Sequence, residues 1–157
     1  MEGSPFLPLP KGMVIDQVQI TETQLTVIAI STRPEAACPG CGCLSEQVHS
    51  QYQRTLRDVS CGGRSVILRL SVRKFFCRQP TCSRRVFTER LPRVVAPYAR
   101  RTKRLTEVVR LLAFVLGGEP GARIVERLGM TTSPATVSKS FKPEVAPKCI
   151  HDTFAGT

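Results

Sequence analysis

The 157-residue sequence predicts an α+β fold, in which a small β module is followed by a three-helix helix-turn-helix. Three observations support this prediction. β-branched runs and period-two alternation dominate the first half of the chain, two cysteine pairs lie in that half, and apolar residues recur at intervals of three and four from Arg101 onward. We expect a β-hairpin in residues 1–37 that leads into a cysteine-bearing module in 38–98, then the helix-turn-helix in 99–142 and a disordered tail in 143–157.

The strands are predicted from β-branched residues and from alternation. Residues 13–20 and 24–30 are β-branched runs separated by three polar residues, which predicts a hairpin. Within residues 66–73 every second residue is apolar, and two arginines fall on the opposite face. This alternation predicts a half-buried strand with a basic outer surface. Its apolar residues are Val66, Leu68, Leu70 and Val72.

Three helices are predicted in the second half of the chain. Over residues 101–116 the apolar residues form one stripe at helical spacing, and Gly117–Gly118 ends this helix. A short second helix is expected over residues 119–128. Ser133 is a suitable N-cap, and it predicts a third helix over residues 134–142.

The charge of the chain indicates a polyanionic partner. The formal net charge is +11; residues 38–100 hold twelve basic and three acidic side chains, and residues 101–142 hold eight and three. The alternative is a surface whose charges serve only solubility. The sequence shows no secretory leader and no apolar run of membrane-spanning length, so we expect a protein of the reducing cytoplasm without membrane association.

Two closely spaced cysteine pairs predict a metal site. Cys38 and Cys41 form one pair, and Cys77 and Cys82 form the other. In a reducing compartment an odd set of seven cysteines favours metal ligands over disulfides. Two tight turns that each present two sulfurs suit a tetrahedral Zn²⁺ ion. We therefore expect a structural zinc ion in a zinc-ribbon-like module.

The sequence leaves other ligands and other ions open. Cys43, Cys61 and His49 lie in the same region as alternative ligands. Four thiolates also suit iron or an iron-sulfur cluster, and cysteine pairs without any metal are a further alternative. Cys43 is expected outside the site, because Cys41 and Cys43 would bind one ion only with strain. Four thiolates imply no open coordination position, so the expected role of the metal is structural rather than catalytic.

The helical segment supplies candidate DNA-binding residues. In a helix-turn-helix the last helix enters the major groove, where Ser133, Thr136 and Lys139 would meet base edges or phosphates. Basic residues at the head of the first helix would meet phosphates. They are Arg100, Arg101, Lys103 and Arg104. The alternative is an ordinary three-helix bundle whose charged faces are solvated.

Several runs of residues together resemble a known family. They are Cys38–Gly42, Val48–Ser50, Leu56–Asp58, Val72–Cys77 and Arg85–Phe87 in the β module, with Ala99–Thr102, Gly117–Glu119 and Leu128–Met130 in the helical segment. In order, spacing and non-ligand residues the chain is similar to the amino-terminal zinc-finger and helix-turn-helix region of bacterial insertion-sequence transposases of the ISL-three group. The resemblance covers roughly residues 10–142.

The resemblance implies a bacterial, nucleoid-associated protein that binds double-stranded DNA at the terminal repeats of a transposon. In the family a catalytic domain with a carboxylate triad follows this region, whereas Asp16, Asp58 and Asp152 are scattered along the chain. We therefore expect a truncated transposase that is not an enzyme. The alternative is a regulatory fragment that pairs with full-length transposase, or with a second copy of itself, through a strand edge at Gln24–Ile30.

Overall fold

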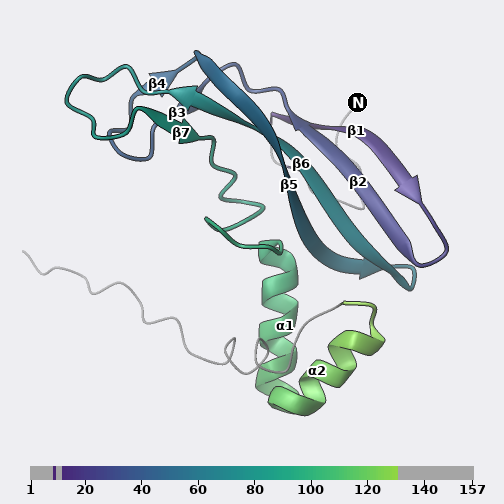
Figure 1. The fold of residues 1–157 in the computed structure, drawn as a ribbon. Helices are drawn as coiled ribbons and strands as arrows, with labels where there is room; N and C mark the ends of the chain where they lie inside the picture. Colours follow the sequence, from purple (N-terminus) through teal and green to yellow (C-terminus); the bar gives the residue numbers. More distant parts are fainter. Residues whose placement is uncertain (1–8, 10–11, 131–157) are drawn as a thin grey trace, which may run out of the picture.

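A five-stranded sheet forms the body of the protein (Figure 1). The computed structural model describes Leu9 and residues 12–130. The strands of the sheet follow the order β1-β2-β6-β5, and β7 pairs with β6. They are β1 (Met13–Ile20), β2 (Gln24–Ser31), β5 (Val48–Cys61), β6 (Arg64–Phe76) and β7 (Val86–Thr88), while β3 (Ala36–Ala37) and β4 (Leu44–Ser45) form a separate two-stranded sheet. The helices are α1 (Lys103–Leu116) and α2 (Gly118–Arg127).

The N-terminal hairpin lies where the β-branched runs predicted it. Strands β1 and β2 pair antiparallel, and Thr21 Oγ1 accepts the N–H of Gln24 at 3.0 Å across the turn. Strand β2 also pairs in parallel with β6, so the hairpin shares one sheet with the cysteine-bearing module. Because β2 lies between β1 and β6, the expectation that Gln24–Ile30 offers an edge for pairing is wrong. The edge of the sheet on this side is β1.

The hairpin of β5 and β6 is the longest element pair, with strands of 14 and 13 residues. Gly62 and Gly63 form its turn with φ values of 57° and 75°, which a side chain would disfavour. The alternation predicted along β6 is confirmed, since each apolar residue of the set is buried and Arg69 is exposed. These side chains build the main core together with Ala29, Leu56 and the loop that carries Val94 and Val95.

The two helices predicted over residues 101–116 and 119–128 are confirmed, with boundaries that differ by at most two residues. Thr102 caps α1, because its Oγ1 accepts the N–H of Leu105 at 3.1 Å. The apolar faces of α1 and α2 meet in a second core of Leu105, Val109, Ala113, Ala122, Val125 and Met130. In Figure 1 the helices lie at one end of the sheet, away from β3, β4 and β7. Neither helix of the described chain combines the length and apolar character needed to cross a bilayer.

The predicted fold class is wrong in its balance of elements. Of the described residues 42% lie in strands and 20% in helices, and there are two helices among them, so this part of the chain is mostly β-sheet. The alternation of apolar and polar residues indicates too few strand residues, because polar residues interrupt it along β5. This strand forms because β6 pairs with it along most of its length. The third helix predicted over residues 134–142 and the tail predicted over 143–157 lie outside the described residues.

A buried carboxylate joins α1 to the sheet. Asp58 on β5 is 4% exposed and accepts hydrogen bonds from Thr102 Oγ1 at 2.6 Å and from Arg104 Nη2 at 2.7 Å. Next to it, the N–H of Arg57 donates to the carbonyl of Arg100 at 3.0 Å, and the N–H of Thr102 donates back to the carbonyl of Arg57 at 3.0 Å. The start of the helix is thus held by both the side chain and the backbone of β5.

Replacing Asp58 with alanine should lower the free energy of unfolding by about 3 kcal/mol, because Arg104 loses its counter-ion and the buried Thr102 hydroxyl loses its acceptor. The control Asp16→Ala removes an exposed carboxylate of β1 and should change the free energy by less than about 0.5 kcal/mol. Urea denaturation followed by circular dichroism measures both. Equal stability of the two variants would show that the Asp58 contacts do not hold the helix to the sheet.

Candidate metal centre

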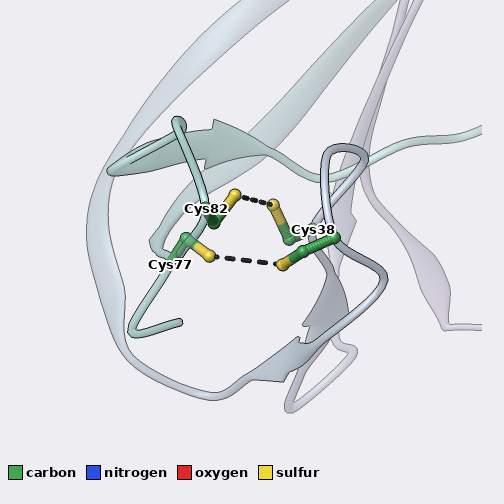
Figure 2. A group of neighbouring side chains, drawn as sticks. Cys38, Cys77 and Cys82 are labelled. Carbon is green, nitrogen blue, oxygen red and sulfur yellow. Dashed lines mark hydrogen bonds between the residues drawn. The ribbon is translucent and has the colours of Figure 1, made fainter. Parts of the chain in front are cut away.

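Two loops bring four cysteine sulfurs together at the end of the sheet remote from the helices (Figure 2). One loop follows β3 and carries Cys38 and Cys41, and the other joins β6 to β7 and carries Cys77 and Cys82. All four Sγ atoms lie within 4.8 Å of one another. Across the two loops, the Sγ atoms of Cys38 and Cys82 are 3.9 Å apart, and those of Cys41 and Cys77 are 3.6 Å apart.

These separations fit a tetrahedral zinc ion. With Zn–S bonds near 2.3 Å, the edges of the sulfur tetrahedron are about 3.8 Å long, which is close to the two measured separations between the loops. Four thiolates complete the coordination of Zn²⁺, so the ion would have no position for a substrate or an activated water. The chemistry of this donor set is therefore structural, and the ion would link two loops that are distant in sequence.

Backbone N–H groups point at the sulfurs from each loop. The N–H of Gly40 donates to Cys38 Sγ at 3.4 Å, and the N–H of Arg84 donates to Cys82 Sγ at 3.4 Å. A Cβ atom at Gly40 would stand 3.3 Å from Cys82 Sγ and 3.2 Å from Arg84 Cδ, so glycine allows the loops to approach. Gly42 has a φ of 76°, and its N–H donates to the Cys38 carbonyl at 2.8 Å to close the first turn.

An apolar shell covers the cluster on its inner side. Cys38, Cys77 and Cys82 are buried together with Phe75 and Phe87, whose stacked rings have centroids 5.9 Å apart. Cys41 is the ligand that reaches the surface. A shell of low polarity strengthens the attraction between thiolates and a cation and limits access of water to the sulfurs.

The electrostatics of the cluster favour a bound cation. Burial raises the pKa of the Cys38 thiol, but the N–H groups of Gly40 and Cys41 and the neighbouring thiols lower it to about 7. For Cys77 the N–H of Gln79 lowers the pKa, whereas burial and the other three thiols raise it to about 12. One thiolate therefore forms at the expense of another, because like charges at this distance oppose each other. A divalent cation removes that conflict.

The structure excludes the alternative ligands from the cluster. Cys43 and Cys61 are exposed, and Cys61 ends β5 beside the turn at the opposite end of the hairpin. His49 is exposed on β5, where its Nδ1 lies 2.8 Å from Ser50 Oγ and its ring meets Phe76 edge to face. Within the described part of the chain, the four predicted cysteines are the one group of three or more potential ligands that would share an ion.

The candidate DNA-binding residues at the head of α1 differ in their surroundings. Arg100 and Lys103 are exposed. Arg104 is taken up by its ion pair with Asp58, so its guanidinium contributes to docking of the helix. Arg101 is half-buried, and burial lowers the pKa of its guanidinium. Ser133, Thr136 and Lys139 lie outside the described residues.

Sequence reasoning missed Arg84 and Phe87 as parts of the metal centre. Arg84 supplies a backbone N–H to Cys82, and Phe87 packs on the cluster from β7. The signal for Phe87 is its place in the short apolar run Val86–Phe87, which begins four positions after Cys82. A backbone donor such as Arg84 carries no side-chain signal at all.

A comparison with protein-family models agrees with this geometry. Residues 34–82 match the model described as the zinc-finger of transposase IS204/IS1001/IS1096/IS1165. No curated protein and no solved structure matches the chain significantly. The matched segment holds all four clustered cysteines, so the chain contains a zinc ribbon similar to that of these transposases, and the cluster fits structural zinc.

Serine in place of any one clustered cysteine should abolish tight zinc binding, because a hydroxyl does not replace a thiolate ligand on Zn²⁺. Elemental analysis of the purified protein should find one zinc ion per chain in the parent and close to none in Cys38→Ser or Cys82→Ser. Cys43→Ser is the matched control and should keep its zinc. Loss of zinc from the Cys43 variant, or its retention by the others, would assign the ligands differently.

Proposed function

We propose that the protein binds double-stranded DNA at the terminal repeats of a transposable element, as part of DNA transposition. The observation that carries the proposal is the transposase-type zinc ribbon, with its four sulfurs at the spacing of a zinc site. The zinc ion would fix two loops of a basic surface, and the basic residues would neutralise phosphates. Phosphate binding by this surface does not depend on the helix predicted over residues 134–142.

The distribution of charge supports a polyanionic partner. Residues 38–100 hold twelve basic and three acidic side chains, and two of the three acids are buried. Asp58 accepts hydrogen bonds from Thr102 and Arg104 inside the fold. Glu89 accepts hydrogen bonds from Ser31 Oγ at 2.7 Å and from the Arg73 N–H at 2.8 Å. The charged side chains on the outer surface of this region are therefore almost all basic.

We propose further that this chain binds DNA without cutting it. Strand transfer in the resembled family needs carboxylates that converge on divalent metal ions. Here Asp58 is committed to Arg104, and Asp16 is exposed on β1 at the sheet edge. Purified protein incubated with supercoiled plasmid and Mg²⁺ or Mn²⁺ should leave the plasmid intact, and metal-dependent nicking would contradict this part of the proposal.

A second candidate function is pairing with full-length transposase or with another copy of this chain. One observation favours it: β1 is an edge strand, and its Val18 and Ile20 are exposed beside an apolar pocket of about 510 Å³ between the sheet and α1. The bulge after Ile15 turns Val18 and Ile20 toward this pocket. Light scattering across a concentration series separates a monomer from a self-paired species.

Binding to a duplex that carries the element's terminal repeat should weaken as salt rises. If about five cations contact phosphates, the logarithm of the association constant should fall with the logarithm of the salt concentration at a slope of about −4 to −5. Fluorescence anisotropy of a labelled duplex measures this slope. Lys103→Ala removes an exposed cation of α1 and should make the slope less steep by about 1, whereas Lys11→Ala, in the acidic N-terminal segment, should leave it unchanged.

Removal of zinc should reduce the same binding, because the two loops are no longer held together. The midpoint of thermal unfolding should fall in parallel. Re-addition of Zn²⁺ should restore both quantities. DNA binding that is insensitive to salt, or that is equally strong after complete zinc removal, would contradict the proposed function.

A further inference from the structure

A groove of about 810 Å³ runs along one side of the molecule between the metal centre and the start of α1. The side chains that matter for its chemistry are Tyr52, Lys74, Arg84, Arg90, Tyr98 and Arg100, and we call it the tyrosine groove. Pro39 and Arg84 come from the two cysteine loops, so the metal centre forms one end of the groove. Its floor includes β5 and β6 through Thr55 and Val72.

The cations of the tyrosine groove have no internal counter-ion. Among the ion pairs of the described chain, none involves Lys74, Arg84, Arg90 or Arg100. Glu89 is the acidic residue that lines the groove, but it is 5% exposed and its carboxylate already accepts hydrogen bonds from Ser31 and Arg73. Arg84 and Arg100 are exposed and Lys74 and Arg90 are half-buried. Four cations without an acidic partner therefore line one depression, and this charge complements a phosphate backbone.

Tyr98 stands at the wall of this groove in a conformation that costs free energy. Its φ is 60°, which makes it the one non-glycine residue with a positive φ in the described part of the chain, and the residue is 89% exposed. The surrounding loop is pinned, since Arg54 Nη2 donates to the carbonyls of Ala96 at 3.1 Å and Ala99 at 2.6 Å. A strained residue whose ring contributes little to the core is typical of a binding site.

The second tyrosine of the groove presents an aromatic ring in the same depression. Tyr52 is 39% exposed, and Lys74 Nζ lies 5.3 Å from the centroid of its ring. Aromatic rings set among cations in a groove are the combination by which proteins hold unpaired strands, because bases stack on the rings while cations follow the phosphates. In a duplex the faces of the bases are already stacked inside the helix, so it offers only edges and backbone to such rings.

We propose that the tyrosine groove binds a short stretch of single-stranded DNA, with a base stacked on Tyr98 and phosphates beside Arg84, Arg90 and Arg100. The inference rests on the proposed function, since it takes the nucleic acid to be DNA. It adds a second mode of recognition to duplex binding. The volume of the groove suits a few nucleotides of one strand and is too small to enclose a duplex.

The protein carries its own probe of this groove. It has no Trp and two Tyr, and both tyrosines line the groove, so intrinsic tyrosine emission reports on occupancy of this site. Titration of the zinc-loaded chain with a 12-nucleotide single strand should quench this emission. Tyr98→Ala should weaken binding of a labelled single strand, measured by anisotropy, by roughly 5- to 150-fold. Tyr98→Phe should retain the affinity, because the ring still stacks.

Three further variants test whether loss of binding comes from the groove itself rather than from a loss of stability. Tyr98→Gly should unfold at a midpoint no lower than the parent, because glycine accepts the positive φ, and should lose single-strand binding. Arg100→Ala should weaken single-strand binding, whereas Arg69→Ala, the charge-matched control on the exposed side of β6 outside the groove, should not. A Tyr98→Gly variant that binds the single strand as tightly as the parent would overturn the proposal.

The outcomes distinguish this inference from the function on which it rests. Duplex binding with no quenching by the single strand would overturn the inference and leave the proposed function standing. Failure of both duplex and single strand to bind would overturn both. An RNA of the same sequence is the third arm, and tighter binding of RNA than of DNA would overturn the assignment to DNA. Quenching by the single strand, lost in Tyr98→Ala while duplex affinity stays, is the expected result.

Discussion

Four sulfur atoms lie within 4.8 Å of one another, although they come from two separate loops. One loop lies between β3 and β4, which form a small sheet of their own, and the other joins β6 to β7 of the main sheet. In the absence of a cation these thiols compete for charge, so a cation is what makes their proximity favourable. The same loops place Arg84 and Pro39 at the end of the tyrosine groove and pack Phe75 and Phe87 beneath the ligands. The metal ligands, this part of the core and this end of the groove therefore all depend on the same two loops.

Two acidic and two basic residues of the chain stabilise the fold through internal contacts. Asp58 and Glu89 are buried and act inside the fold, one on the start of α1 and the other on the backbone of β6. Among the cations, Arg54 and Arg104 are also engaged internally and hold the loop around Tyr98 and the first turn of α1. Within residues 38–100, Glu46 is then the one acidic residue left on the surface, against twelve basic residues in the same segment.

Features with a local signal could be predicted from the sequence. The cysteine pairs, the N-terminal hairpin and the two confirmed helices each depend on spacing or capping within a short window, and Thr102 and Gly117 mark the ends of α1 as such rules require. Features that join distant residues could not be predicted. Nothing near Arg104 indicates that Asp58, 46 positions earlier, neutralises it, and no local pattern shows that β2 pairs in parallel with β6. The total strand content was missed for the same reason.

The parallel pairing of β2 with β6 has a kinetic consequence. Residues Gln24 and Ser65 must meet across about forty intervening positions, whereas the β5–β6 hairpin closes through a turn of two glycines. Ordering a long loop before any contact forms is slow, so the local hairpins are expected to precede their union into one sheet. During synthesis the β1–β2 ribbon leaves the ribosome with an open, β-branched flank and waits for β6 to emerge, which makes it the segment most exposed to wrong partners while the chain is growing.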